Sequence, residues 1–419
     1  MKILKFGGAS VKSAEGIKNL AHILDSVSEN HIVVISAMGK MTNKFEELSL
    51  AYFKQDFSVQ TIFEQIYKYH LNIIKDLFKD QDDIHSLYNN HTENLKTKLE
   101  IEPSLDYSYE YDQIVSYGEI LSTTIVSAYL NKIGQENKWI DIRKGIKTDC
   151  TFREGKLNWK LSEELCNELF NFQNTFKYVT QGFIAGTTTN MTTSLGREGS
   201  DYTGAILANL LNADSLTIWK DVPGIMNADP KEYEDASILK YLSYRESIEL
   251  AHFGAKVIHP KTIKPLENKN IPLFVRSFIN PEEIGSIVGI NSENSNLMPI
   301  YIHKRNQVLL SLSPRDLSFI GESELCTIVS LARKNNTKIN LIQSSAISLS
   351  LCCDFKEELF SSFFDKLKKD FFILYNENKE LITVRHFNEQ SIKRVTKGKN
   401  ILLEQRTRVT AHFVVDCID

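Results

Sequence analysis

The chain opens with Ile3-Leu4-Lys5-Phe6-Gly7-Gly8, a short, mostly apolar stretch that ends in two glycines. Residues 13–28 follow with apolar side chains every three or four positions, and this spacing predicts an amphipathic helix. His31-Ile32-Val33-Val34-Ile35-Ser36 is a second apolar run, of the length of a buried strand. The order strand, loop, helix, strand predicts an α/β domain built on a parallel sheet.

Strand-like and helix-like patterns go on alternating to about residue 290, and we predict one domain over residues 1–290. Within it, residues 61–99 carry apolar side chains at intervals of three and four among charged ones, which predicts a helical hairpin. Residues 111–130 predict one further helix. Residues 291–300 are polar and rich in Asn and Ser, and we expect a linker there.

Beyond the linker, the patterns predict strand, helix, strand, strand and helix in that order, which is typical of ferredoxin-like modules. We place one complete module at about 313–380. The remaining residues, 381–419, are too few for a separate domain. We expect them to form a second, truncated module together with the strand at 301–312.

The composition limits the kinds of partner. The 419 residues include 49 Lys and Arg and 53 Asp and Glu, a net charge of −4, which argues against nonspecific nucleic-acid binding. No apolar run reaches the roughly 18 residues of a membrane-spanning helix, and the N-terminus lacks the apolar core of a signal peptide. The six cysteines lack metal-binding spacing. We therefore expect a cytoplasmic protein with buried free thiols, no metal-binding residues, no nucleic-acid partner and no membrane contact.

The turn after the first strand is a candidate phosphate site. Gly7 and Gly8 let the main chain approach an anion and direct N–H groups at it, and the following helix adds its positive end. Lys5 can place its ammonium on a phosphate. A plain tight turn is an equally good interpretation of these residues alone, and the P-loop pattern is absent.

Two further loops follow predicted strands. The loop at 36–43 holds Thr42 at a strand end, where ligands bind in open α/β sheets, although a polar turn explains it equally well. The segment 219–231 begins with a strand end and holds Lys220 and Asp221. Its lysines and aspartates can surround a nucleotide and its metal.

Residues 182–202 contain the densest group of Gly, Thr and Ser, directly before a predicted helix. They carry Arg197 and Asp201, and they can offer N–H groups and a guanidinium to a carboxylate or phosphate. Glu119 stands beside Gly118 in an otherwise apolar helix. It could hold an amine, and the alternative is a surface glutamate.

Four segments resemble, in this order along the chain, the motifs of aspartate kinase in the amino-acid kinase superfamily: Lys5–Val11, Leu195–Tyr202, Trp219–Ile225 and Gly254–Pro260. Residues 301–375 resemble the ACT regulatory module of that family. The resemblance implies an amino-acid kinase-type three-layer sandwich with a largely parallel sheet, followed by a C-terminal ferredoxin-like ACT region.

The resemblance also implies the reaction: ATP and L-aspartate give 4-phospho-L-aspartate and ADP, the first step of lysine, threonine and methionine biosynthesis. This chemistry fits the residues, because an ionised carboxylate needs no general base and the protein has only to position it and to neutralise the moving phosphoryl group. Mg²⁺ is expected with the ATP, mostly on phosphate oxygens. A homodimer through the ACT region is the expected assembly.

Carried over residue by residue, the resemblance implies three sets of site residues. The catalytic set would be Lys5, Asp201 and Lys256. The substrate-binding set would be Thr42, Glu119, Arg197 and Ser200. The nucleotide-binding set would be Lys5, Gly7, Gly8, Ser10, Lys220, Asp221, Met226, Lys231, Lys256 and Val257.

The chain departs from the family pattern in places. Glu198 stands where a Gly is usual, beside Arg197. Asn340 and Ala346 stand where lysine-sensitive members carry Asp and Glu, so we predict weak or absent inhibition by lysine and leave the amino-acid effector open. Two alternatives to the function stay open: another amino-acid kinase, acting on glutamate, acetylglutamate, carbamate or UMP, and a catalytically inactive amino-acid sensor that works through the ACT region.

Overall fold

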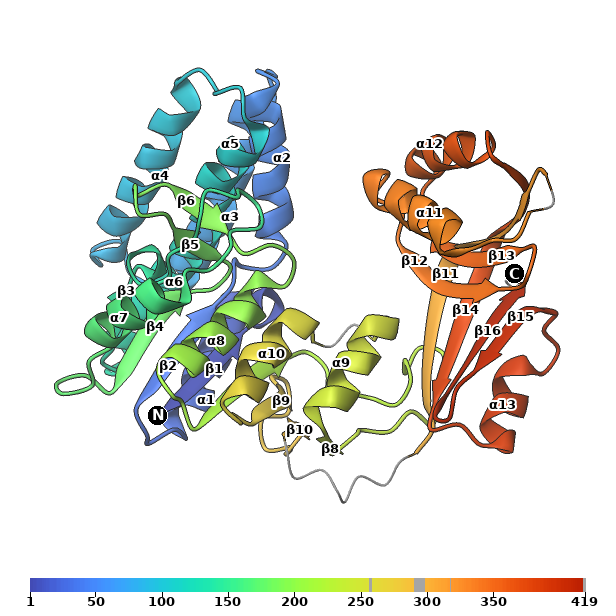
Figure 1. Ribbon diagram of the computed structural model, residues 1–419. Helices are drawn as coiled ribbons and strands as arrows, with labels where there is room; N and C mark the ends of the chain where they lie inside the picture. Colours follow the sequence, from blue (N-terminus) through green and yellow to red (C-terminus); the bar gives the residue numbers. More distant parts are fainter. Residues whose placement is uncertain (256–257, 290–297, 317, 417–419) are drawn as a thin grey trace. The chain divides into compact units, whose positions relative to one another are not determined.

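The computed structural model describes residues 1–255, 258–289, 298–316 and 318–416, and the chain forms two compact units (Figure 1). The first unit consists of Met1–Ile225, Ile238–Ile248 and Lys256–Ser295. The second consists of Met226–Ser237, Glu249–Ala255 and Asn296–Asp419. Two segments that precede the expected linker therefore belong to the second unit. The predicted domain boundaries at 290 and 301 stay a prediction.

The first unit is built on an eight-stranded sheet in the order β3-β4-β2-β1-β7-β9-β10-β8. Its strands are β1 (Lys2–Phe6), β2 (His31–Ile35), β3 (Lys138–Ile140), β4 (Lys177–Gln181), β7 (Ser215–Lys220), β8 (Tyr241–Leu242), β9 (Leu273–Ser277) and β10 (Ser286–Val288). Every neighbouring pair is parallel except β9 with β10. This arrangement confirms the largely parallel sheet that the opening residues predict.

Helices cover both faces of this sheet, as the three-layer prediction requires. Alternate residues of a strand point to opposite faces. Leu4 and Phe6 of β1 lie in the apolar core with α1 (Ala14–Asp25) and α6 (Tyr117–Lys132). On the other face, Gly204 of α8 (Gly199–Leu210) stands so close to β1 that an added Cβ would lie 3.7 Å from Lys5 Cβ.

The remaining elements of the first unit connect or flank these layers. They are α2 (Met41–Phe53), α3 (Val59–Leu77), α4 (Ile84–Glu100), α5 (Tyr107–Val115), α7 (Trp159–Leu169), α10 (Pro260–Asn268), the hairpin β5 (Ile184–Gly186) with β6 (Thr192–Ser194), and the short 3₁₀ helices η1 (Gly8–Val11) and η2 (Ile142–Lys144). A further helix, α9 (Tyr244–Phe253), begins in the first unit and ends in the second. The helical hairpin predicted at 61–99 is confirmed as α3 and α4.

The single helix predicted at 111–130 is wrong. The structure has two helices there, α5 and α6, which are separated at Ser116. The Ser116 hydroxyl donates to the carbonyl oxygen of Gln113 at 3.1 Å. A serine that bonds back to the preceding turn competes with the helix ladder and bends the chain, and apolar spacing does not register this effect.

The second unit is a six-stranded antiparallel sheet in the order β12-β13-β11-β14-β16-β15. Its strands are β11 (Ile300–Pro314), β12 (Ile339–Ser344), β13 (Leu349–Asp354), β14 (Phe371–Arg385), β15 (Ile401–Arg406) and β16 (Thr410–Asp416), and its own helices are α11 (Glu322–Lys334), α12 (Glu357–Leu367) and α13 (Glu389–Thr396). The long strands β11 and β14 pair along their length, and both contribute to three apolar clusters of the described residues. One cluster includes Val308 and Phe371, the second Tyr301 and Val384, and the third Leu309 and Leu381.

The cysteines follow the expectation only in part. Cys166, Cys352 and Cys353 are buried free thiols, as predicted. Cys150 and Cys326 are free but exposed, which corrects the expectation, because one lies in a loop and the other on the outer side of α11. Among the described residues, no helix has the length and apolar character needed to cross a membrane.

Candidate active site

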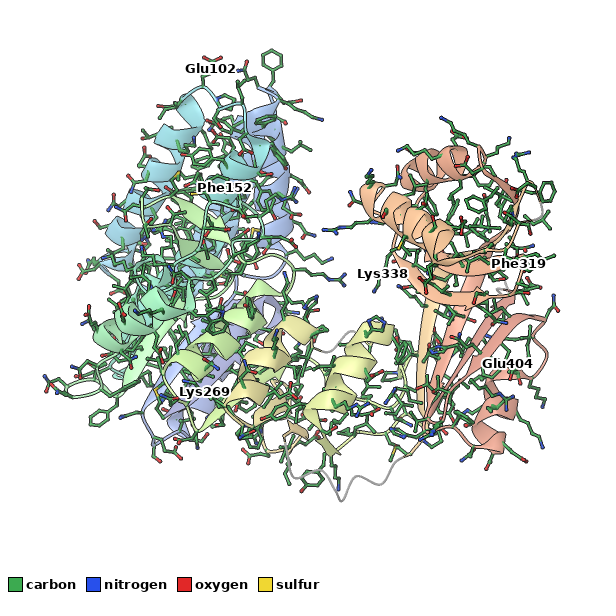
Figure 2. The ribbon with its side chains drawn as sticks, viewed as in Figure 1. Glu102, Phe152, Lys269, Phe319, Lys338 and Glu404 are labelled. Atoms are coloured by element: carbon green, nitrogen blue, oxygen red, sulfur yellow. The ribbon has the colours of Figure 1, made fainter. Side chains whose placement is uncertain are left out.

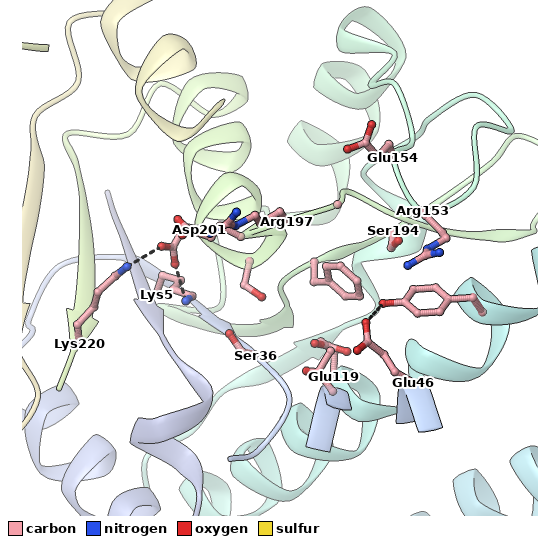
Figure 3. A pocket seen from close by; sticks show the side chains of 17 residues that line it. Lys5, Ser36, Glu46, Glu119, Arg153, Glu154, Ser194, Arg197, Asp201 and Lys220 are labelled. Atoms are coloured by element: carbon pink, nitrogen blue, oxygen red, sulfur yellow. Dashed lines mark hydrogen bonds and ion pairs between the residues drawn. The ribbon is translucent and has the colours of Figure 1, made fainter. Parts of the chain in front are cut away.

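A cavity of about 820 Å³ opens in the first unit, at the carboxyl ends of the central parallel strands (Figure 3). Open α/β sheets bind their ligands at this edge. The sheet contributes Lys5, Ser36 and Lys220, which end or follow β1, β2 and β7. Helices α2, α5 and α6, the loop before α8 and the first turn of α8 supply most of the remaining lining. Residues from three of the four predicted motifs, far apart in the sequence, therefore meet in one pocket: Lys5, the segment 196–201 and Lys220.

Two lysines converge on one buried carboxylate at the sheet side of the pocket. Lys5 Nζ lies 2.5 Å from Asp201 Oδ1, and Lys220 Nζ lies 3.2 Å from Asp201 Oδ2. Burial alone would raise the pKa of Asp201, but the two ammonium groups hold it below its ordinary value. Asp201 also stands in the first turn of α8, where the helix dipole favours a negative charge. The arrangement fixes two positive charges at the strand ends.

In the turn after β1, Gly8 approaches its neighbours too closely for any side chain, whereas a side chain at Gly7 would make an ordinary van der Waals contact. A Cβ on Gly8 would lie 2.5 Å from the carbonyl oxygen of Ala37, and a Cβ on Gly7 would lie 3.8 Å from Lys5 Nζ. The main chain of Gly7 therefore runs beside the lysine ammonium, as a phosphate cradle requires. Ser10 is buried in η1 and its N–H donates to the carbonyl oxygen of Gly7 at 3.0 Å.

Glu119 of α6 is 2 % exposed, so the alternative of a surface glutamate is wrong. Its Oε1 accepts a hydrogen bond from the N–H of Ala37 at 3.2 Å, and its Oε2 has no partner among the described residues. Burial raises the pKa of Glu119 to about 8. Gly118 explains the close approach of α6, because a Cβ there would lie 3.0 Å from Ala37 Cβ and 3.2 Å from the Phe45 ring. The pocket thus contains a buried carboxylate that can still accept a donor.

The other predicted substrate residues, Thr42, Arg197 and Ser200, also line the pocket. The loop that carries Arg197 turns sharply, with a φ of +76° at Gly196 and +54° at Glu198. A left-handed conformation at Glu198 explains why a glycine would suit this position.

Several predicted nucleotide residues are not brought into this pocket. Asp221 is exposed just beyond β7 and does not line it. Met226 and Lys231 lie in the segment Met226–Ser237 of the second unit. Lys256 and Val257 lie outside the described residues. Gly7, Gly8 and Ser10 do not line the pocket either. Nucleotide binding by all of the predicted residues, Lys5 and Lys220 included, stays a prediction.

The pocket also contains residues that the sequence did not single out. Tyr111 of α5 donates its hydroxyl to Glu46 Oε1 at 2.6 Å, and the Arg153 guanidinium lies 4.4 Å from the Tyr111 ring centroid. Asp112 is buried behind them and accepts a hydrogen bond from Ser194 Oγ at 2.6 Å. Burial raises the pKa of Asp112 to about 6. Of these residues, only Ser194 could have been found from the sequence, because it belongs to the run of Thr and Ser at 192–194.

A group of possible metal ligands occurs in the second unit, where atoms of Glu232, His303 and Glu380 lie within 4.8 Å of one another. Its charges are already compensated, because Arg305 lies 3.0 Å from Glu232 and Lys399 lies 2.6 Å from Glu380. Although burial alone would raise it, hydrogen bonds from His303 and Lys399 lower the pKa of Glu380 to about 2. We interpret the group as an ion-pair network and assign no metal to it.

Comparisons with known proteins agree with this geometry. Residues 1–277 match the amino acid kinase family. Lysine-sensitive aspartokinase 3 of Escherichia coli is 31 % identical over 367 residues, which cover 84 % of this chain and 78 % of that protein. The bifunctional aspartokinase/homoserine dehydrogenase 2 of Arabidopsis thaliana is 35 % identical over 291 residues, 68 % of this chain and 32 % of that protein. The chain thus spans about a third of the bifunctional relatives.

Solved structures give the same result for the fold. E. coli aspartokinase III in complex with lysine and aspartate has a TM-score of 0.84 at 27 % identity, over 99 % of this chain and 96 % of that chain. The same protein with aspartate and ADP has a TM-score of 0.83, at the same identity and coverage. The likeness extends over both units, including the antiparallel sheet expected for an ACT region. The chain therefore belongs to the amino acid kinase family and, within it, to the aspartokinases.

Proposed function

We propose that the protein transfers the γ-phosphoryl group of ATP to the β-carboxylate of L-aspartate, giving 4-phospho-L-aspartate and ADP. One observation carries the proposal: a single pocket joins the lysine pair on Asp201 with the buried Glu119, whose Oε2 is unpartnered among the described residues. Ammonium groups suit a phosphoryl group, and a buried carboxylate suits the amine of an amino acid. The complex of the E. coli relative with aspartate and ADP supports this pair of ligands.

In the proposed reaction, an oxygen of the β-carboxylate attacks the γ-phosphorus and the bond from that phosphorus to the bridging oxygen of ADP breaks. The nucleophile is already ionised at neutral pH, so no base has to remove a proton. Lys5 would neutralise charge on the transferring group, and Asp201 would hold Lys5 and Lys220 in place. Arg197 would bind a carboxylate and Glu119 the ammonium.

ATP would lie with its phosphates on the glycine turn, since a side chain at Gly7 would enter the space beside Lys5 Nζ. We expect Mg²⁺ with it. Both oxygens of Asp201 already contact lysines, so the residues fit a metal held mainly by phosphate oxygens. When bound, Mg²⁺ supplies charge neutralisation at the phosphates.

The proposal is tested by trapping the acyl phosphate as its hydroxamate, with ATP, Mg²⁺ and L-aspartate. We expect product with L-aspartate and not with L-glutamate. Arg197→Ala should lower kcat/KM for aspartate by about 100-fold or more, because a charged hydrogen bond to the substrate is lost. Lys156→Ala, which removes an exposed charge elsewhere in the first unit, is the control. Activity on glutamate, acetylglutamate, carbamate or UMP alone, or no activity at all, would contradict the proposal and favour the alternatives.

We further propose that lysine binds this protein weakly or not at all. Asn340 Nδ2 donates to Gln307 Oε1 and to Asp354 Oδ1, both at 2.7 Å, and Asn340 Oδ1 accepts from Lys304 Nζ at 2.7 Å. These bonds use most of the polar capacity of the amide. Isothermal titration with L-lysine should therefore show no binding in the micromolar range, and micromolar binding would refute this part.

We also propose that the protein is cytoplasmic and that it forms a homodimer through the second unit. Phe372 and Leu374 of β14 are 57 % and 61 % exposed. Phe319, which is labelled in Figure 2, is 76 % exposed. Phe372 and Leu374 alternate along β14 and therefore share one face of the sheet, and exposed apolar side chains that lie together on a surface are typical of an interface. Light scattering in solution gives the assembly directly, and a monomer at micromolar concentration would contradict it.

A further inference from the structure

The pocket holds a second arginine besides Arg197, and its main chain has an uncommon conformation. Arg153 lines the cavity with a φ of +68°, in the left-handed region that side chains with a Cβ rarely adopt. Such conformations persist only where the surroundings enforce them, and they gather at functional sites. The left-handed conformation of Arg153 therefore needs a structural explanation, and it indicates a role for this residue in the pocket.

The cause is a hydrogen-bonded support beneath the loop. The N–H of Arg153 donates to Asp112 Oδ2 at 2.7 Å. The same carboxylate accepts the N–H of Ser194 at 3.0 Å and its hydroxyl at 2.6 Å. Asp112 is 1 % exposed. The loop is thus tied through a buried side chain to β6, and the position of Arg153 Cα is fixed relative to the pocket wall.

The side chain is positioned as well. Its guanidinium lies 4.4 Å from the centroid of the Tyr111 ring, and the Tyr111 hydroxyl is held by Glu46 Oε1 at 2.6 Å. Stacking on an aromatic face restricts a guanidinium and leaves its N–H groups free to bind an anion. The neighbouring carboxylates are already engaged, Asp112 by Ser194 and Glu46 by Tyr111. In the part of the chain that the structure describes, Arg153 forms no ion pair.

The distribution of charged side chains along the pocket indicates which chemical group Arg153 can bind. Lys5, Lys220 and Asp201 lie at one end in Figure 3, and Arg153 lies at the other, beyond Glu119. Consider an amino acid bound with its reacting carboxylate toward the lysines and its ammonium toward Glu119. Its remaining charged group then points away from the lysines. For an aminodicarboxylate, that group is a second carboxylate.

We propose that Arg153 binds the carboxylate of the substrate that is not phosphorylated, and that it makes the pocket selective for aminodicarboxylates. The inference rests on the proposed function. Arg153 contacts no reacting atom in this assignment, so it is a specificity-determining residue. It supplies a guanidinium to the α-carboxylate of L-aspartate.

The test compares two substrates in the full-length protein: L-aspartate, and L-aspartic acid α-amide, in which a neutral amide replaces the α-carboxylate. Arg153→Gly is the main variant, because glycine adopts a φ of +68° without strain and should keep the thermal unfolding midpoint. We expect the KM for aspartate to rise about 10- to 100-fold. The KM for ATP and the kinetics with the α-amide should match the wild type.

Two further variants sharpen the result. Arg153→Lys keeps the charge and should recover part of the affinity for aspartate. Lys156→Ala removes an exposed charge from the same loop and should behave as the wild type. A wild-type KM for aspartate in Arg153→Gly, or an equal loss with both substrates, would overturn the inference alone. A wild-type protein that does not phosphorylate aspartate would refute the proposed function and the inference with it.

Discussion

Glu119 shows how one buried side chain can set the pH dependence of an enzyme. Burial raises its pKa to about 8, so the free protein holds it mostly neutral at pH 7. An ammonium needs the ionised form, so substrate binding must release a proton. We expect kcat/KM for aspartate to rise by up to about tenfold per pH unit between pH 6 and pH 8.

The check is a pH profile of the wild type beside that of Glu119→Gln, which cannot ionise. The variant should bind aspartate about 10- to 100-fold more weakly and lose the rise. The substrate ammonium keeps its proton through this range and does not account for the slope. A profile of the same slope in Glu119→Gln would show that another group titrates.

Among the helices, α3 carries a buried histidine that makes the helical hairpin sensitive to acid. His70 is 0 % exposed, its Nδ1 donates to the carbonyl oxygen of Ile66 at 2.8 Å, and its Nε2 has no partner among the described residues. Burial lowers the pKa of His70 to about 4. The neutral ring thus contributes stability that is fully present above pH 6.5 and is lost as the pH falls toward 4.

The full loss amounts to about 3 kcal/mol, from a pKa of about 4 against 6.5. We expect His70→Leu, which cannot titrate, to flatten the fall of the urea midpoint between pH 7 and pH 4.5. His22→Leu, at an exposed position of α1, is the control and should follow the wild type. If the urea midpoint of His70→Leu falls with pH as steeply as that of the wild type, another group causes the acid sensitivity.

At the scale of the whole molecule, the segment Met226–Ser237, which precedes the expected linker, belongs to the same unit as the C-terminal sheet. Within the second unit, Arg394 pairs with Asp235 at 2.6 Å and stacks over the rings of Tyr233 and Tyr301. Those contacts hold the segment Met226–Ser237, which contains two of the predicted nucleotide residues, on α13 and β11 of the second unit.

We therefore expect Arg394→Ala to raise the KM for ATP by about 3- to 10-fold, because a segment that is no longer held must be ordered when ATP binds. The KM for aspartate should stay as in the wild type. Lys393→Ala, the exposed neighbour on α13, removes the same charge without these contacts and serves as the control. Equal ATP kinetics in both variants would contradict a link between this sheet and nucleotide binding.

The sequence by itself determined the parallel sheet and the identity of most of the pocket. Runs such as His31–Ile35 and the helix spacing of 13–28 are local patterns, and local patterns report local structure. Lys5 and Glu119 stood out because they lie in apolar elements close to glycines, and Arg197 and Asp201 stood out as charged residues in a run of Gly, Thr and Ser before a helix. The break at Ser116 did not stand out, since a side-chain bond to the preceding turn leaves the apolar spacing unchanged.

Only the tertiary structure decided which charges meet. The contact of Lys5 with Asp201 joins residues nearly two hundred positions apart, and the burial that raises the pKa of Glu119 comes from packing of α6 on the loop at Ala37. The support of Arg153 by Asp112 and the place of Met226–Ser237 in the second unit are likewise long-range. Spacing along a chain carries no information on such contacts, because desolvation and charge pairing depend on distances that exist only after folding.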